Sequence, residues 1–227
     1  MSEAIAAATV LPLRDGPDGI EVLMLKRSSR GAFGGLWVFP GGKVDPEDGE
    51  EELASARRAA VREAMEEASI AIEEASLVTW SHWLPPETKA PGAQGYVAAR
   101  FSTWFFVAAA HESGEVVVDG GEIHEHAWLR PHDALAKRAA GEIELAPPTF
   151  TSLSQLALYA TVEEVLAAGR AQAEPPRHHT RIVMLDGTRV LLWAGDSGYA
   201  TGELDLPGPR NRVVWREPDL VWDRTFA

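Results

Sequence analysis

The alternation of apolar and polar residues predicts an N-terminal β-hairpin followed by a brief third strand. Apolar residues dominate positions 9–13 and 20–25, and a polar turn at 15–19, rich in glycine and aspartate, separates them. After a polar, glycine-rich loop, a short apolar stretch at 36–39 ends at Pro40. The chain is therefore expected to begin with antiparallel strand pairing.

The segment 50–68 carries the clearest helix signal in the chain. It contains no glycine or proline and consists mainly of alanine, glutamate and arginine, residues that favour helices. One face of the predicted helix presents small apolar residues, which allow close packing on a sheet. They are Leu53, Ala56, Ala60, Ala64 and Ala68, with Val61 beside them.

Further strands and helices are predicted in the middle of the chain. Apolar runs predict strands at 77–80, 98–109 and 126–129. Pro131 suits the first turn of a helix, which is predicted over 131–140. A second helix is predicted over 149–168, ended by Gly169.

The C-terminal part of the chain has a different pattern, typical of a small β-structure. A linker with two prolines is predicted over 171–179. The apolar segments 181–185 and 189–193 then flank Asp186-Gly187, a strong hairpin signal, and 213–215 predicts a third strand. We therefore divide the chain into a main domain, residues 1–170, and a linker with a β-rich appendage, residues 171–227.

Composition and charge narrow the classes of function. The chain has 227 residues, no cysteine and a formal net charge of −13. Disulfides, thiolate nucleophiles and cysteine-based zinc sites are excluded, and the cytoplasm is the expected location. No secretory signal and no membrane span is predicted. The acidic surface disfavours nucleic-acid polymers, whereas a phosphorylated small molecule remains suitable if divalent cations reverse the local field.

Three glutamates on the helix over 50–68 form the candidate chemistry. Glu63, Glu66 and Glu67 have the spacing i, i+3 and i+4, so their side chains project from one helical turn. Such a triplet is commonly only a solvated face. The Gly41-Gly42 bend after a short strand changes that interpretation, because a backbone carbonyl and carboxylates, without histidine or cysteine nearby, favour Mg²⁺, Mn²⁺ or Ca²⁺ over Zn²⁺.

These residues resemble the Nudix box, written G-x5-E-x7-R-E-U-x-E-E-x-G-U, where U is a bulky aliphatic residue. The residues on its named positions are Gly42, Arg62, Glu63, Glu66, Glu67 and Ile70. The chain departs from the pattern in three respects. The distance from Gly42 to Arg62 is longer, which implies an insertion over 45–52. Ala54 stands eight residues before Arg62, where a glutamate is expected, and Glu51 or Glu52 is a candidate substitute. Ser69 replaces a glycine, and Ala64 is small for an aliphatic position.

A wider resemblance covers residues 9–168 and points to the branch that includes coenzyme A diphosphatases of the peroxisomal type. The matching segments are 22–28, 38–42, 83–86, 100–107, 128–131 and 145–149. The resemblance implies an α/β fold, a Nudix-type α/β/α sandwich around a mixed sheet. It also implies a homodimer and Mg²⁺-dependent hydrolysis of a diphosphate linkage, with Mn²⁺ as a substitute. The expected substrate is a nucleotide-derived small molecule, with coenzyme A or an acyl derivative first.

The resemblance also assigns roles to individual residues. The residues expected to bind the metal are Gly42, Glu63, Glu66 and Glu67. The residues expected to be catalytic are Glu66, Glu67 and Glu122. Glu122 is the candidate general base because it lies in a late acidic loop, with Glu125 in reserve. A solvated loop is an equally good interpretation of that stretch. Arg27 and Arg62 are candidate substrate-binding residues. Arg30 lies in the same loop as Arg27, and a purely solubilising role is an equally good interpretation of both loop arginines. Arg62 is also expected to pair with Glu66 at i, i+4 and to hold that carboxylate in position.

Alternative functions remain open at this point. A catalytically silent Nudix-like nucleotide sensor is disfavoured because the three box glutamates are present. A Nudix-fold isomerase is disfavoured because its own set of metal ligands is not visible. ADP-ribose and dinucleoside polyphosphates remain alternative substrates. Trp83 and Trp104 are expected in the core rather than on a nucleobase, and His178 and His179 are expected to be exposed and inert.

Overall fold

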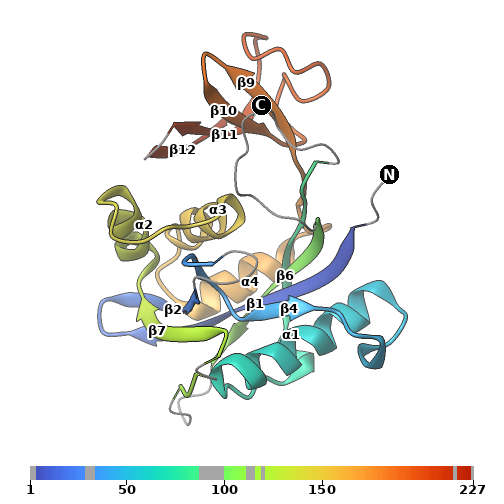
Figure 1. Ribbon diagram of the computed structural model, residues 1–227, viewed down its shortest axis with the longest axis vertical. Helices are drawn as coiled ribbons and strands as arrows, with labels where there is room; N and C mark the ends of the chain where they lie inside the picture. The colour runs from blue at the N-terminus through green and yellow to red at the C-terminus, as the bar shows by residue number, and fades with distance from the viewer. Residues whose placement is uncertain are drawn as a thin grey trace.

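A mixed eight-stranded β-sheet, which includes a strand beyond residue 170, forms the larger of the two sheets in the computed structural model (Figure 1). The structure describes residues 4–28, 34–86, 100–110, 116–118, 121–216 and 219–225. The strands of this sheet are β1 (Ile5–Gly16), β2 (Gly19–Arg27), β3 (Trp37–Val38), β4 (Gly41–Lys43), β5 (Val78–Leu84), β6 (Phe101–Ala109), β7 (Ile123–Leu129) and β8 (Arg177–His179).

The longest strand, β1, organises the sheet. It pairs with β2 in the predicted antiparallel hairpin, which closes between Gly16 and Gly19, and with β6 in parallel. β4 pairs with β1, antiparallel, at the end of β1 opposite the hairpin turn. Because β4 contains Gly41 and Gly42, this pairing fixes the glycine bend of the Nudix-like motif to the central strand.

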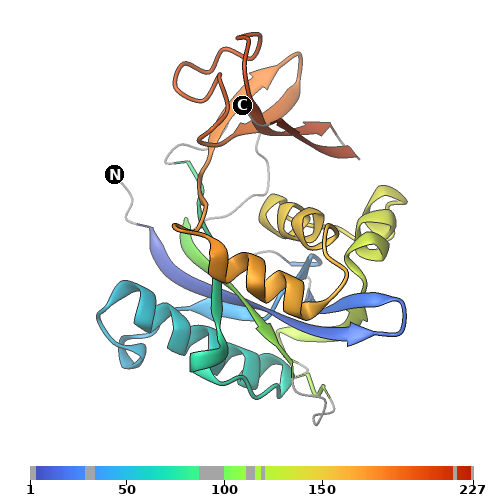
Figure 2. The same cartoon turned by 180° about the vertical axis from the view of Figure 1, so that it is seen from behind.

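Helices cover both faces of the sheet, which confirms the α/β sandwich (Figures 1 and 2). The helix α1 (Glu52–Ala68) lies on one face, where its buried alanines pack against residues such as Val10 and Phe106. The predicted small-residue stripe is thus confirmed, and small side chains allow the helix to approach the strands closely. The helices α2 (Pro131–Ala139), α3 (Pro147–Leu156) and α4 (Val162–Ala171) lie on the other side.

The prediction of one helix over 149–168 is wrong, because the segment forms α3 and α4 with a break between them. Thr161 caps the start of α4, where its side chain accepts a hydrogen bond from the backbone N–H of Glu164. Gly169 lies inside α4 rather than after it. A Cβ at Gly169 would lie 2.7 Å from Val78 Cγ1, so glycine there serves close packing of helix on strand.

The C-terminal residues form a second, four-stranded antiparallel sheet, here called the C-terminal sheet. Its strands are β9 (Arg181–Leu185), β10 (Thr188–Leu192), β11 (Arg210–Arg216) and β12 (Asp219–Thr225), in the order β12-β11-β10-β9. The predicted hairpin at Asp186-Gly187 is confirmed, and both residues have positive φ, as a two-residue turn of this type requires. The strand β12 was not predicted from the sequence.

The junction between the two sheets is aromatic. β8 pairs in parallel with β5, and the chain then continues into β9. The imidazole of His178 stacks on Trp83 with ring centroids 4.1 Å apart and meets Trp193 edge-on. The prediction that His178 is exposed is wrong, since only 4% of this residue is accessible to solvent. It is buried because β8 places its side chain between the two sheets. His179 is exposed, as predicted, and Trp83 and Trp104 lie in the core.

Replacing His178 with phenylalanine is expected to make the protein more resistant to acid. Burial lowers the pKa of His178 to about 3, and positive charge from Arg224 adds to the effect. A histidine with a lowered folded-state pKa contributes stability above its unfolded pKa of 6.5 that is lost as pH falls toward 3. The loss is about 1.4 kcal/mol per pH unit for one buried histidine.

The phenylalanine variant keeps a ring against Trp83 but cannot be protonated. Its free energy of unfolding at pH 7 should be equal or higher, because neither ring nitrogen of His178 has a hydrogen-bond partner among the described residues. Urea unfolding at pH 7, 6 and 5 measures the slope. His132→Gln, at an exposed site on α2, is the control. An unchanged slope in H178F would contradict the prediction.

Among the helices in the described part of the chain, none combines the length and apolar character needed to span a bilayer.

Candidate active site

The glycine bend and the helix α1 meet at one point because of close backbone packing. A Cβ on Gly41 would lie 2.4 Å from the carbonyl oxygen of Ala8 on β1, so no larger residue fits there. A Cβ on Gly42 would lie 2.2 Å from Oε1 of Glu63. The structure therefore places the Glu63 carboxylate directly against the Gly42 backbone.

Glu67 is the most buried carboxylate of the three. It is 6% exposed, and its Oε2 accepts a hydrogen bond of 3.0 Å from the backbone N–H of Gly41. Burial raises the pKa of Glu67 to about 7, against the opposing effects of the Gly41 N–H and Arg27, while the negative charges of Glu63 and Glu122 raise it further. The negative charges of Glu63 and Glu122 near the Glu67 carboxylate favour a bound cation at this place.

Glu63 and Glu66 are held by the neighbouring Arg62. Its Nη1 donates to Oε1 of Glu63 at 2.9 Å and to Oε2 of Glu66 at 3.4 Å. Burial raises the pKa of Glu63, although the hydrogen bond from Arg62 opposes the shift. Glu66 is the most exposed of the three glutamates, with 59% of its side chain accessible. Arg62 thus orients carboxylates with different degrees of solvation.

Arg27, at the end of β2, connects Glu67 to the late acidic loop. Its Nη1 lies 3.4 Å from Oε1 of Glu67, and its Nη2 donates to Oε2 of Glu122. Glu122 is thereby brought to the box glutamates from a distant part of the sequence. The alternative candidate base, Glu125, is not linked to the box glutamates in this way, because its carboxylate pairs with Lys26 at 2.7 Å. Arg30 lies outside the described residues.

The sequence analysis missed one carboxylate of this region. Asp48 lies in the 3-10 turn Pro46–Asp48, inside the predicted insertion, and is almost completely buried. Burial opposes its ionisation, but hydrogen bonds from Arg62 and the backbone N–H of Asp45 prevail and lower the pKa of Asp48. The only sequence signal was an acidic residue between a proline and a glycine, which is also typical of a solvated turn.

The donor set suits a hard divalent cation. Carboxylate oxygens and the Gly42 carbonyl, without sulfur or imidazole, match the preferences of Mg²⁺ and Mn²⁺. In the described part of the chain, no three acidic or histidine side chains are already gathered as a metal cluster. In this structure the ion-pair partners of the carboxylates are Arg27 and Arg62.

Replacing Gly42 with alanine should impair the site without unfolding the protein. The new methyl group would meet the flexible end of Glu63, so this carboxylate must move, and activity should fall roughly 10- to 100-fold. Gly41→Ala is the contrasting variant, because its methyl group meets the backbone of Ala8 and Thr9 and should lower the melting temperature. Activity and thermal unfolding of both variants distinguish the two effects. Normal activity in G42A would contradict the placement of Glu63.

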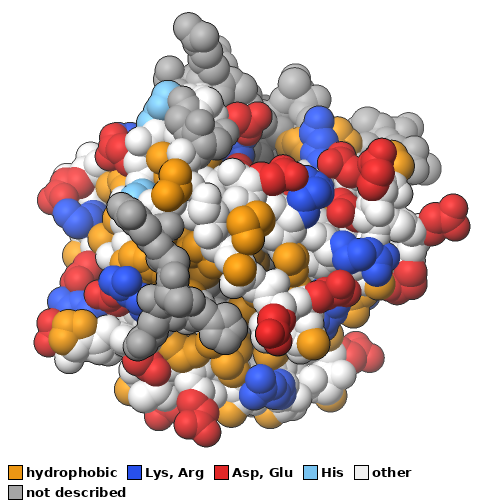
Figure 3. Space-filling view, turned by 90° about the horizontal axis from the view of Figure 1, so that it is seen from below, with side chains coloured by type: hydrophobic (Ala, Val, Ile, Leu, Met, Phe, Trp, Pro, Cys, Tyr) orange, Lys and Arg blue, Asp and Glu red, His pale blue; other side chains and the backbone are white. Residues whose placement is uncertain are grey.

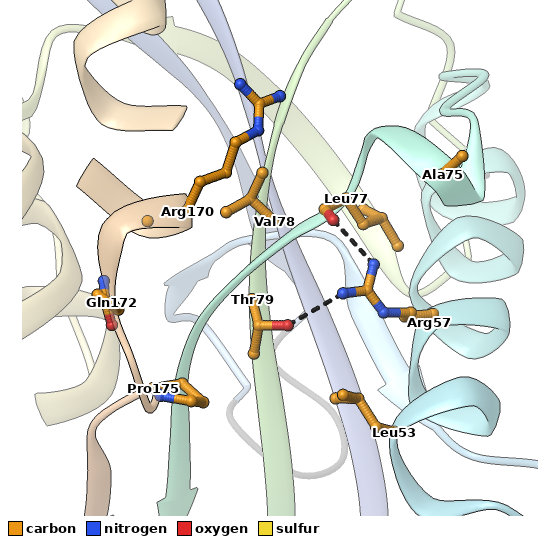
Figure 4. Close-up of a pocket in the computed structure, with 10 residues that line it drawn as sticks. Leu53, Arg57, Ala75, Leu77, Val78, Thr79, Arg170, Gln172 and Pro175 are labelled. Carbon is orange, nitrogen blue, oxygen red and sulfur yellow. Dashed lines mark hydrogen bonds between the residues drawn. The ribbon is translucent and has the colours of Figure 1, made fainter. Parts of the chain in front are cut away.

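Two hollows of the described surface lie away from these carboxylates. One, of about 330 Å³, lies between α1, β5 and α4, where Arg57 donates to the Leu77 carbonyl and to Thr79 Oγ1 (Figure 4). Another, of about 400 Å³, includes Trp80 and Arg224. Neither contains a residue of the Nudix-like motif, so we do not assign substrate binding to them.

The described surface seen in Figure 3 has acidic and basic side chains interspersed, without a continuous basic area.

Comparison with known proteins places this geometry in context. The family model described as NUDIX domain matches residues 4–149. The acyl-coenzyme A diphosphatase NUDT19 of Xenopus laevis is 32% identical over 141 residues, which cover 61% of this chain but only 36% of that protein. The nucleoside triphosphatase NudI of Escherichia coli is 30% identical over 116 residues, 51% of this chain and 77% of that protein.

The fold has relatives among solved structures. A NUDIX hydrolase from Alicyclobacillus acidocaldarius superposes with a TM-score of 0.64 at 22% identity, covering 74% of this chain and 97% of that one. At this identity the likeness concerns the fold alone.

Proposed function

The chain belongs to the NUDIX domain family, and from this premise we propose that it hydrolyses a diphosphate linkage in a nucleotide-derived small molecule. One observation carries the proposal. Glu67 is buried against Gly41, is acted on by the negative charge of Glu63, and is linked through Arg27 to Glu122, so a chain of charged contacts connects three distant segments. A bound cation would offset the unfavourable effect of the negative charges of Glu63 and Glu122 on the buried Glu67 carboxylate.

A divalent cation would be held by Glu63, Glu66, Glu67 and the Gly42 carbonyl, and when bound it would neutralise charge on the substrate phosphates. The remaining roles belong to the side chains themselves. Glu122 is the general base in this proposal, because its carboxylate is 68% exposed and reaches solvent water. Arg27 holds Glu122 near Glu67 and offers positive charge to a phosphate. The attacking water loses its proton to Glu122, its oxygen bonds to phosphorus, and the bridging P–O bond breaks.

Arg62 has a different role in this proposal from the substrate contact expected from the sequence. Its Nη2 donates to the Lys43 carbonyl and to Asp48, and its Nη1 donates to Glu63 and Glu66. Since these contacts hold the guanidinium between the Lys43 carbonyl and three carboxylates, Arg62 serves to position the carboxylates. Arg27 stays a candidate for contact with substrate, where a phosphate would compete with Glu67 and Glu122 for its two terminal nitrogens.

Coenzyme A or an acyl derivative is the first substrate proposed. Support comes from the match to an acyl-coenzyme A diphosphatase over 141 residues. The chain covers only about a third of that relative's length, and NudI, named a nucleoside triphosphatase, matches at similar identity. Nucleoside triphosphates, ADP-ribose and dinucleoside polyphosphates therefore belong in the same test.

The test is hydrolysis in ¹⁸O-labelled water with 5 mM Mg²⁺, 5 mM Mn²⁺ or excess EDTA, concentrations chosen as about saturating for weak sites. Coenzyme A, acetyl-coenzyme A, ADP-ribose, diadenosine tetraphosphate and the nucleoside triphosphates are supplied separately. We expect metal-dependent cleavage with label in one phosphorylated product, detected by mass spectrometry. Tight nucleotide binding without turnover would instead support a sensor, and turnover in EDTA would overturn the metal-dependent mechanism.

A further inference from the structure

The inserted turn between Gly42 and α1 contacts the candidate metal-binding helix through one buried residue. Asp48 has 7% of its side chain accessible, and its two oxygens face the guanidinium of Arg62, at 3.0 Å from Nη2 and 3.4 Å from Nε. This is a two-point contact, which fixes the plane of a guanidinium as well as its position.

The glutamate expected from the Nudix box does not supply this contact. Ala54 stands at that position, and the nearby acidic residues are engaged elsewhere. Glu51 caps the start of α1, where its carboxylate accepts from the backbone N–H groups of Leu53 and Ala54. Glu52 accepts a hydrogen bond of 3.0 Å from Nε1 of Trp104. Neither candidate substitute named from the sequence is therefore the partner of Arg62.

The turn that carries Asp48 is itself built to hold the aspartate in place. The backbone N–H of Asp45 donates to Oδ2 of Asp48 at 2.9 Å, and Arg58, one helical turn before Arg62, donates to the Asp48 carbonyl. Gly49 has a φ of 106° and faces Arg58, whose Nη2 would lie 2.5 Å from a Cβ there. Two arginines of α1 thus hydrogen-bond to Asp48: Arg62 to its carboxylate and Arg58 to its backbone carbonyl.

The consequence reaches the candidate metal ligands through the opposite edge of the same guanidinium. With Nε and Nη2 occupied by Asp48 and the Lys43 carbonyl, Nη1 is directed at Glu63 and Glu66. We propose that Asp48 is a positioning residue that replaces the missing box glutamate: it locks Arg62, which in turn orients the carboxylates of Glu63 and Glu66. This inference rests on the proposed function of that site.

The test uses Mn²⁺ alone as the probe, with free Mn²⁺ measured by electron paramagnetic resonance on the full chain. Asp48→Asn keeps the size of the side chain but removes its charge, and we expect the Kd for Mn²⁺ to rise roughly 10-fold or more. The turnover number should fall by a similar factor while the KM changes little. Glu47→Gln, at an exposed position of the same turn, is the matched control and should bind Mn²⁺ normally.

A double-mutant cycle distinguishes positioning from general weakening of the turn. If Asp48 acts through Arg62, then R62A and the double variant D48N/R62A should have the same Kd for Mn²⁺. Additive losses in the double variant would overturn the proposal, as would an unchanged Kd in D48N. A rise in Kd that follows only from a lowered melting temperature would also overturn it, so thermal unfolding is measured for each variant.

The two proposals fail in different ways. Absence of Mn²⁺ binding by the wild-type chain would overturn the proposed function. Wild-type binding that D48N leaves intact would overturn only the role of Asp48.

Discussion

Replacing Glu67 with glutamine should lower the turnover number roughly a thousandfold, the middle of the range for losing a group that acts on the reacting atoms. Glutamine retains the shape of the side chain and can still accept the hydrogen bond from Gly41. It cannot supply the negative charge that the proposed cation requires. The measurement is the initial rate with the substrate identified by the panel, at saturating Mg²⁺.

The same variant should remain folded, which separates a catalytic effect from a structural one. The pKa of Glu67 is raised from 4.5 to about 7, so its contribution to the free energy of unfolding is fully present below pH 4.5 and is lost as pH rises through 7. Glutamine removes this loss, and the melting temperature of E67Q at pH 8 without metal should equal or exceed that of the wild type.

Added Mn²⁺ gives a second readout for E67Q. It should raise the melting temperature of the wild type, because a ligand that binds only the folded state stabilises it, and should have a much smaller effect on E67Q. Glu73→Gln, at an exposed site beyond α1, is the control and should behave as the wild type in both assays. Near-normal turnover in E67Q would show that the cation, if one is used, binds elsewhere.

Replacing Asp196 with alanine should reduce the free energy of unfolding by about 3–5 kcal/mol, the usual cost of leaving one member of a buried ion pair alone. Asp196, between β10 and β11, forms two contacts of 2.6 and 2.7 Å with Arg212 of β11, and its side chain has no accessible surface. The backbone N–H groups of Gly198 and Asn211 also donate to this carboxylate. Alanine would leave the Arg212 charge and both N–H groups without their partner.

Urea unfolding followed by tryptophan fluorescence measures this loss, because Trp193, Trp215 and Trp222 lie in or beside the C-terminal sheet. The control is Glu142→Gln, which breaks an exposed pair with Lys137 and should cost less than about 1 kcal/mol. Equal effects of the two substitutions would show that burial of the Asp196–Arg212 pair has no energetic consequence.

The division of the chain at residue 170 stays a prediction, and a separate transition for the C-terminal sheet in D196A would support it.

Local patterns in the sequence were sufficient to predict several elements. The alanine-rich run fixed α1 because an uninterrupted series of good helix formers with a small-residue face has few alternatives. Asp186-Gly187 predicted its hairpin because both residues tolerate positive φ. The order of Gly42, Arg62, Glu63, Glu66 and Glu67 was enough to indicate the family, since the spacing within one helical turn determines which side chains share a face.

Contacts between distant segments could not be predicted from local sequence patterns. Tertiary contacts determine the break between α3 and α4 and the burial of His178. The identity of a single residue does not indicate which strand its segment will contact. The pairing of Arg27 with both Glu67 and Glu122 joins positions 40 and 95 residues apart. Asp48 in the sequence is one acidic residue in a polar turn. Only the tertiary structure shows that burial beside Arg62 makes it part of the site, because the energy of a charge depends on its surroundings more than on its identity.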